Sequence, residues 1–376
     1  MRWMSMFALV GLGFATAAHA ADDKAADLFS PKAPPLKIEI TLDKENRTLL
    51  DKDPRKYVRV TFKANDITLG DVGMHLKGAA GSFRGFDDKP AMTLNFDKFS
   101  KNQVFFGLDK IHLNNSVQDG SFFNEIIAAD VFSRAGLPMA RFTHARVELN
   151  GRKVGMYLVK EGYDKTFLKR FFPDSSGNLY DGGFLQDIDA PIKQDSGTGK
   201  DHQDLKVLLA ACREPNEKKR WELLNKNLDV EKFVSLAVME TLTGDWDGYA
   251  RNRNNYRLYH DPKTDKFVFI PHGKDQLFQN PGDGIWHGWG SIVGQAVLNH
   301  PEGKKMYIAR MKEMVEKVFT VVSMHKTIDA YLPRAKEIAE KIDKGYGMGF
   351  ENEAKAEKQR IKDRVDFVKK ELPNLK

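Results

Sequence analysis

The chain has 376 residues, of which 41% are apolar and 30% charged, and its formal net charge is +7 at pH 7. Lysine and arginine are interleaved with aspartate and glutamate, so the basic stripe or tail typical of nucleic-acid binders is missing from the sequence. Cys212 is the only cysteine, which excludes an internal disulfide and a cysteine-based metal cage. The chain must therefore be held together by its apolar core, for which it is long enough.

Residues 1 to 20 have the pattern of a signal peptide. They combine Arg2, an apolar middle and the small-residue end Ala-His-Ala before Ala21. The apolar stretch is too short to span a bilayer, and no later run is long enough. We therefore expect an exported protein without a stable membrane span. Residues 21 to 36 are polar and proline-rich, which predicts a mobile leader.

The front half of the sequence predicts strands and one helix. Residues 37 to 47 and 56 to 64 alternate apolar and polar side chains, as half-buried strands do. A helical period begins at Ser121, a plausible N-cap, and ends at Gly136. Asn150-Gly151 between two alternating runs predicts a β-hairpin. These elements indicate an N-terminal lobe with a connector over residues 37 to 186.

The back half is mostly helical. Apolar stripes with helical spacing follow a polar stretch at residues 187 to 204, and a strand pair is expected around Asp261. Residues 303 to 372 carry long charged amphipathic patterns that predict two or three helices. The fold class is therefore α+β. Residues 187 to 376 are expected to form a helical C-terminal lobe, and a cleft is expected between the two lobes.

The stretch TGDWDGYARNRNNYRLYHD, residues 243 to 261, places hard oxygen groups beside an apolar run, and Asp275 follows the next strand. Asp and Asn in loops often satisfy only local backbone, as in Asx turns and helix caps. Asp245, Asp247 and three asparagines beside two apolar strands favour a polar site instead. Carboxylate and amide oxygens are also the ligands that Mg²⁺ prefers.

Several ordered motifs resemble the CotH kinase family. They run from about residue 56 to 280 and include KGAAGSFR, KPAMTLNF, ARVELNGRKVGMYLVKEGYDKTFL, DWDGYARNRNNYRLY and IPHGKDQLF. The resemblance implies an atypical protein-kinase-like bilobal fold that binds ATP and Mg²⁺ or Mn²⁺ in its cleft. It also implies phosphorylation of Ser or Thr on an exported or surface protein.

The resemblance implies roles for residues of the N-terminal lobe. A glycine-rich cradle for phosphates would use Gly78, Gly81, Ser82 and Arg84. Without the resemblance, an ordinary strand-to-strand turn with a basic surface would be the preferred interpretation of this segment.

A strand lysine, Lys89, would contact the α- and β-phosphates and be held by the helix residue Glu125. The alternative is that these two are unrelated surface charges. Glu161, after the hairpin, would meet the ribose or base of the nucleotide, or would cap a turn.

In the C-terminal lobe, Asp247 is the expected catalytic aspartate, which accepts or orients the attacking hydroxyl. Asn255 is the preferred amide ligand for the metal and Asn252 its rival, since its spacing from Asp247 matches that of protein kinases. Asp275 would be the carboxylate ligand. Many family members carry a further aspartate where this chain has Gly273, which predicts weaker binding or a single metal ion.

Three functions remain open at this point. The first is an exported ATP-dependent protein kinase, and the second is a kinase-fold binding or assembly protein without activity, a pseudokinase, which Gly273 favours. The third, a hydrolase using paired carboxylates such as Asp245 and Asp247, has no specific support in the spacing.

Overall fold

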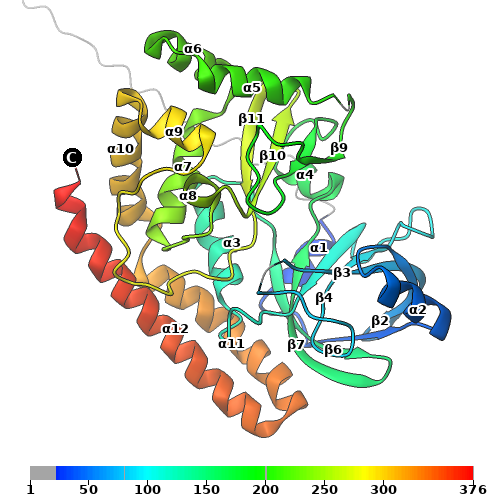
Figure 1. The fold of residues 1–376 in the computed structure, drawn as a ribbon. Helices are drawn as coiled ribbons and strands as arrows, with labels where there is room; N and C mark the ends of the chain where they lie inside the picture. The colour runs from blue at the N-terminus through cyan, green and yellow to red at the C-terminus, as the bar shows by residue number, and fades with distance from the viewer. Residues whose placement is uncertain (1–22, 80, 200, 376) are drawn as a thin grey trace, which may run out of the picture.

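The computed structural model describes residues 23 to 79, 81 to 199 and 201 to 375. The predicted signal peptide lies outside the described residues. Helices and strands are mixed, as the sequence predicts, and they form two bodies: a β-barrel and a larger helical part that contains a small sheet (Figure 1).

The barrel closes on itself in the strand order β1-β2-β3-β4-β5-β7-β6. Six neighbouring pairs are antiparallel, and the parallel pairing of β1 with β6 completes the ring. Residues of β2 alternate buried and exposed along the strand, so its apolar side chains fill the barrel. The strands are Leu36–Thr41, Val58–Ala64, Ile67–Lys77, Ala91–Asn95, Lys110–Asn114, Phe142–Leu149 and Arg152–Glu161 for β1 to β7.

The predicted hairpin is confirmed. Strands β6 and β7 pair up to Leu149 and Arg152, and Asn150 and Gly151 between them both have positive φ, 46° and 76°. That is the geometry of the turn type for which Asn-Gly is favoured.

The helix predicted from Ser121 is α3, Asn124–Arg134, and it begins later than expected. The carboxylate of Asp119 accepts hydrogen bonds from the backbone N–H groups of Ser121 and Asn124, at 2.9 and 3.1 Å. Asp119 therefore caps the first residue of α3, while Ser121 Oγ accepts from the N–H of Phe123, directly before the helix, at 3.1 Å. Although α3 lies between barrel strands in the sequence, its apolar side chains join the core of the helical part.

The helical part contains a four-stranded sheet in the order β11-β10-β8-β9. The hairpin of β10 and β11 confirms the strand pair predicted around Asp261. The elements are α4 Lys165–Phe171, β8 Leu179–Asp181, β9 Lys193–Ser196, α5 Gln203–Arg213, α6 Glu217–Asn227, α7 Val230–Leu242, α8 Tyr249–Asn252, β10 Tyr256–Asp261, β11 Lys266–Pro271, α9 Ile292–Leu298 and α10 Pro301–Lys317.

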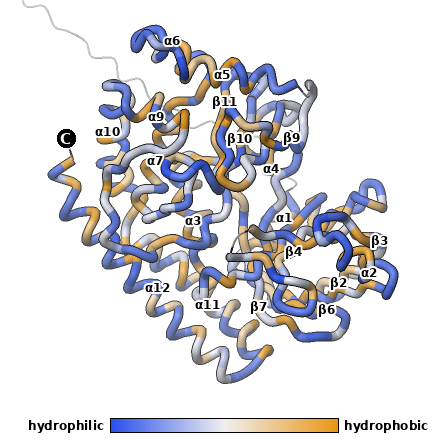
Figure 2. The backbone as a smooth tube through the Cα atoms, viewed as in Figure 1, coloured by the Kyte–Doolittle hydropathy of each residue, from blue (hydrophilic) through white to orange (hydrophobic). Residues whose placement is uncertain are grey.

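Three long helices form the predicted tail: α10, α11 (Val321–Ile342) and α12 (Lys344–Glu371), followed by the short 3₁₀ turn Leu372–Asn374. Helix α11 packs against α3 and the barrel strands β6 and β7, and α12 runs beside it along one edge of the molecule (Figure 1). Apolar residues recur along the otherwise hydrophilic α12 (Figure 2). Among the described residues, no helix is long and apolar enough to span a membrane.

Three segments differ from the prediction. The barrel ends at Glu161, and β8 already belongs to the second sheet, so the division at residue 186 falls too late. Within residues 23 to 36, where a leader without regular structure was expected, helix α1, Ala25–Phe29, buries Leu28 and Phe29. The hydroxyl of Tyr331 on α11 also donates to the carbonyl of Phe29. The predicted strand over 37 to 47 likewise ends at Thr41, and helix α2, Lys44–Lys52, follows.

Candidate active site

A cavity of about 470 Å³ lies where the barrel, α3 and the loops of the helical part meet. Strand ends of the barrel contribute Lys77, Asn114 and Lys160, and α3 contributes Glu125. The opposite wall is formed by Asp247, Asn254, Asn255, His272 and Asp275. The structure therefore brings Glu125, Asp247, Asn255 and Asp275 of the predicted site to one cavity.

A buried lysine–glutamate pair lies at the barrel side of the cavity. The Nζ atom of Lys160 on β7 is 3.6 Å from Oε1 of Glu125, and each side chain is 1% exposed. The other carboxylate oxygen of Glu125 accepts from the amide of Asn114, whose own oxygen accepts from Lys77. Burial lowers the pKa of Lys160 to about 8, although Glu125 counteracts this, and burial also lowers the pKa of Lys77.

The predicted pairing of Lys89 with Glu125 is wrong. Lys89 precedes Pro90, outside β4, and its Nζ lies 4.9 Å from the centre of the Phe122 ring and 5.4 Å from that of Tyr157. Burial lowers the pKa of Lys89 to about 8. The sequence placed the lysine on the strand that follows the glycine-rich segment, whereas the barrel closure brings β7 next to α3. The sequence feature that could have indicated Lys160 is its place as the one lysine in the otherwise apolar strand segment MYLVKE, residues 156 to 161.

The glycine-rich segment forms the strand-to-strand turn that the sequence left open. Gly78 and Ser82 line the cavity, and Ser82 Oγ accepts from the N–H of Ala79 at 3.1 Å within the turn. Arg84 turns back to donate to the carbonyls of Gly81 and Phe83. Gly81 adopts a φ of 82°, which favours glycine.

Glu161 does not face the cavity. It is fully buried at the end of β7 and forms ion pairs with Arg141, at 2.8 Å, and with Arg170. Its carboxylate also accepts from the backbone N–H of Arg141 at 3.1 Å. This fits the capping alternative better than contact with a ribose or base.

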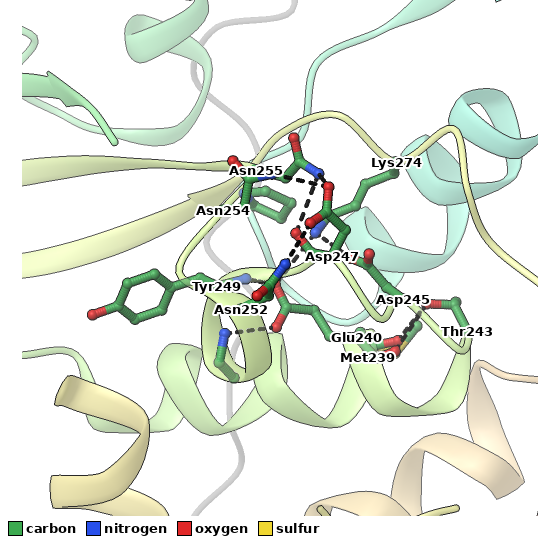
Figure 3. A network of polar contacts seen from close by, with 12 residues as sticks. Met239, Glu240, Thr243, Asp245, Asp247, Tyr249, Asn252, Asn254, Asn255 and Lys274 are labelled. Carbon is green, nitrogen blue, oxygen red and sulfur yellow. Dashed lines mark hydrogen bonds and ion pairs between the residues drawn. The ribbon is translucent and has the colours of Figure 1, made fainter. Parts of the chain in front are cut away.

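Asp247 lies at the centre of an amide cluster (Figure 3). Its carboxylate accepts from the side-chain amides of Asn252, Asn254 and Asn255 at 2.8 to 2.9 Å. Since each amide donates its N–H group, the amide oxygens are directed elsewhere. Asn252 is not among the residues that line the cavity, whereas Asn255 is, so the geometry favours Asn255 of the two rivals.

Asp275 follows β11 and lines the same cavity as Glu125. Burial, together with the carboxylates of Glu125 and Asp119, raises the pKa of Asp275 to about 7. Gly273 adopts a φ of +54°, and a Cβ there would lie 2.5 Å from Oδ1 of Asn255. The glycine thus leaves room for the amide oxygen of Asn255.

The fit of a divalent cation can be judged from these groups. In the part of the chain that the structure describes, no three His, Cys, Asp or Glu side chains cluster as a metal site. Asp275 and Asn255 nevertheless present a buried carboxylate and an amide oxygen to one cavity, and Oε1 of Glu125 is buried without a hydrogen bond. Mg²⁺ commonly uses one or two carboxylates and takes its other ligands from phosphates and water, so this set fits it.

A second buried cluster lies beneath Asp247. The ammonium group of Lys274 hydrogen bonds with Asp245 and lies 3.3 Å from Oε1 of Glu240. Burial opposes the charge of Lys274, but the two carboxylates outweigh it and raise its pKa. The sequence suggested Asp245 only as one of the paired carboxylates of a hydrolase, and nothing in the spacing of Asp245 and Lys274 reveals their contact.

A larger cavity, of about 660 Å³, lies between α1, α3 and α11 and is lined by none of the predicted site residues.

The fold and the cavity define a protein of mixed helices and strands whose polar site combines a lysine–glutamate pair with a loop of aspartate and asparagine. The family described as CotH kinase protein matches residues 75–372. The chain belongs to this CotH kinase family, as the sequence motifs predicted.

Relatives and a solved structure show similarity over different lengths. The inner spore coat protein H of Bacillus subtilis is 24% identical over 356 residues, covering 88% of this chain and 94% of that protein. Invasin CotH2 of Rhizopus delemar is 24% identical over 186 residues, which is 44% of this chain and 31% of the invasin. The crystal structure of the Helicobacter pylori proinflammatory kinase CtkA aligns with a TM-score of 0.35 and 12% identity, covering 80% of this chain and 97% of CtkA.

Proposed function

We propose that this protein is an ATP-dependent protein kinase that transfers a phosphoryl group to a Ser or Thr hydroxyl of an acceptor protein. In this proposal the barrel and the helical part are the two lobes of an atypical kinase-like fold. The observation that carries it is the convergence of the Lys160–Glu125 pair with Asp247, Asn255 and Asp275 on one cavity. Phosphoryl transfer needs this combination of a phosphate-binding cation, metal ligands and a carboxylate for the attacking hydroxyl.

The roles follow from the charges. Lys160, directed by Glu125, and Lys77 are the cations on the barrel side and would bind the phosphates of ATP. Asp275 and the amide oxygen of Asn255 would hold Mg²⁺ or Mn²⁺, which supplies charge neutralisation at the phosphates when bound.

Asp247 would accept a hydrogen bond from the acceptor hydroxyl and orient it for attack. The amides of Asn252, Asn254 and Asn255 fix its carboxylate, so little reorganisation is needed when the hydroxyl arrives.

We place this activity outside the cytoplasm and the acceptor among exported or surface proteins. The support is the signal-peptide pattern of residues 1 to 20. Expression in a bacterial host, fractionation and N-terminal sequencing test this. The expected mature chain begins at Ala21 and is absent from the cytoplasm, and an uncleaved cytoplasmic chain would contradict the assignment.

Transfer of label from γ-labelled ATP tests the activity itself. Wild-type protein with Mg²⁺ or Mn²⁺ is expected to label itself or a generic protein acceptor, and the Asp247→Ala variant is expected to label neither. Chelation of the metal should stop the reaction. Absence of transfer by the wild type under all of these conditions would contradict a kinase.

Gly273 supports a second candidate, a kinase-fold binding protein without turnover. Glycine stands where a second carboxylate ligand is common in the family, and the cavity leaves no room for a side chain there. Calorimetry separates the two: ATP binding without transfer favours the binding protein, whereas binding with transfer favours the kinase.

A further inference from the structure

We propose that Lys274 is a positioning residue that sets Asp247 and Asp275 at a fixed separation by joining the two loops that carry them. The proposal rests on the proposed kinase function, because it assigns Lys274 a part in that reaction. Lys274 touches neither the attacking hydroxyl nor the nucleotide in this assignment, and it acts through Asp245 and Glu240.

The first half of the connection runs from Lys274 to the start of the catalytic loop. Lys274 directly precedes Asp275, and its ammonium hydrogen bonds with Asp245, two residues before Asp247 (Figure 3). The Lys274 side chain is fully buried and that of Asp245 is 2% exposed, so water does not compete for this contact.

The second half runs through Glu240 to the other side of Asp247. Oε1 of Glu240 lies 3.3 Å from Nζ of Lys274 and accepts from the N–H of Tyr249 at 3.0 Å. Its Oε2 accepts from the N–H of Ala250 at 3.1 Å. A Cβ on Gly248 would lie 2.3 Å from the Glu240 carboxyl carbon, so only glycine lets the loop approach this closely.

Asp247 is therefore held from both sides by groups that contact one ammonium. Residues 243 to 248 lie outside any helix or strand and need such contacts to keep one conformation. A further backbone bond, from the N–H of Phe278 to the carbonyl of Thr243 at 2.9 Å, joins the same two loops. The hydrogen bond of Lys274 with Asp245 is a second connection between the two loops, and it lies closer to Asp247 in the chain.

Stability alone is a weak reason for such a cluster. The free-energy cost of removing two charges from water is about as large as the free energy gained from their attraction. A buried ion pair therefore often adds little to the stability of the fold. A directed ammonium between two carboxylates does fix the relative placement of the segments that carry them. A shift of about 1 Å in a catalytic group is enough to slow a reaction about a hundredfold.

The double variant Lys274→Met/Asp245→Asn tests the proposal without leaving an unpaired buried charge on either residue. Glu240 keeps its two backbone partners in this variant. Hydrogen–deuterium exchange of residues 243 to 255 is measured together with kcat and the KM for ATP. Lys89→Met is the matched control, since Lys89 is also a partly buried lysine but is not among the residues that line the cavity.

The expected result is faster exchange over residues 243 to 255, with the remainder of the chain unchanged. We also expect kcat to fall about a hundredfold, with the KM for ATP within about threefold of wild type. Lys274→Met alone serves as a second variant, and its kcat should fall at least as far. The Lys89→Met control should match wild type in exchange and in kcat.

Unchanged exchange over the loop in the double variant, or a wild-type kcat, would overturn the proposal. Failure of the proposed function gives a different result: the wild type itself would transfer no phosphate, and the exchange measurement would still decide whether Lys274 holds the loop. A fall in kcat that is accompanied by a lower unfolding temperature and by faster exchange throughout the chain would indicate general destabilisation. That result would also count against a positioning role.

Discussion

Nζ of Lys160 lies 3.6 Å from Oε1 of Glu125, and both side chains are almost completely buried at the edge of the candidate cavity. One residue belongs to a barrel strand and the other to α3, so the pair joins the barrel to the core of the helical part. The ion pair between Lys160 and Glu125 therefore helps to fix the position of the barrel side of the cavity relative to the helical part.

Replacing Lys160 by methionine is expected to reduce phosphoryl transfer about a hundredfold or more. The change removes a preorganised cation from a water-poor site where it would stabilise charge on the phosphates. Rates of label transfer from ATP measure the effect. Lys89→Met is the control and should stay near wild type, and a greater loss in that control would restore Lys89 as the phosphate-binding lysine.

ATP binding is expected to weaken as pH rises through about 8. Burial lowers the pKa of Lys160 from its ordinary 10.5 to about 8, so the amine becomes neutral above this pH and no longer attracts phosphates. The same shift has the opposite sign for folding: the stability linked to Lys160 is fully present above pH 10.5 and is lost as pH falls through about 8.

Calorimetric titration of the metal-free protein with ATP at about pH 7 and about pH 9.5 measures this effect. The Lys160→Met variant should bind weakly at both values and lose the part of the pH dependence that Lys160 causes. The rest is expected from Lys77 and Asp275, which line the same cavity and have shifted pKa values of their own. A variant with the pH dependence of the wild type would assign the titration to another group.

Asp247→Asn is expected to lower kcat by about 10²- to 10⁴-fold, the usual contribution of a positioned acid–base group. ATP affinity should be retained, because the expected phosphate contacts come from the barrel side. Asp66→Asn, in the exposed turn between β2 and β3, is the control for loss of a carboxylate. A fall in affinity as large as the fall in kcat would give Asp247 a binding role instead.

Restoring a carboxylate at position 273 is expected to weaken metal binding. The backbone there has a φ of +54°, and a Cβ would lie 2.5 Å from Oδ1 of Asn255, so Gly273→Asp displaces a proposed ligand. Mn²⁺ affinity, followed by electron paramagnetic resonance, should fall about tenfold or more, which corresponds to ~1.4 kcal/mol. Gly282→Ala, where the nearest atom would be 3.6 Å away, is the control. Tighter Mn²⁺ binding in Gly273→Asp would mean that the cavity accepts a second carboxylate.

Arg364→Met is expected to destabilise the fold by about 3 kcal/mol or more, because it leaves buried carbonyls without a donor. Arg364 on α12 is fully buried and donates to the carbonyls of Thr241 and Leu242 at the end of α7, at 2.5 and 2.9 Å. It also donates to Pro281 at 3.0 Å. Urea denaturation measures the loss. Lys362→Met is the control and should change stability little, because Lys362 lies on the same helix but is 53% exposed, and its partner Asp366 is 56% exposed. Equal stability of the two variants would show that α12 does not support the loops behind the cavity.

Local patterns were enough for much of the fold. Asn150-Gly151 specified its hairpin because both positions need positive φ, and the amphipathic periods of the tail predicted its helices. Composition did not predict α1, since Leu28 and Phe29 find apolar partners only once the chain is folded. The start of α3 was misplaced because the capping carboxylate, Asp119, precedes the helix by several residues.

For the candidate site, the sequence by itself determined the side of the cavity that lies in one continuous stretch. Asp247 and Asn255 are close in the chain, and Asp275 follows the adjacent strand of a hairpin, so short-range geometry brings them together. Only the tertiary structure decided which lysine pairs with Glu125 and what Lys274 contacts. Those pairs join segments 35 and 29 residues apart, and closure of the barrel and packing of α7, rather than any local spacing, fix their distances.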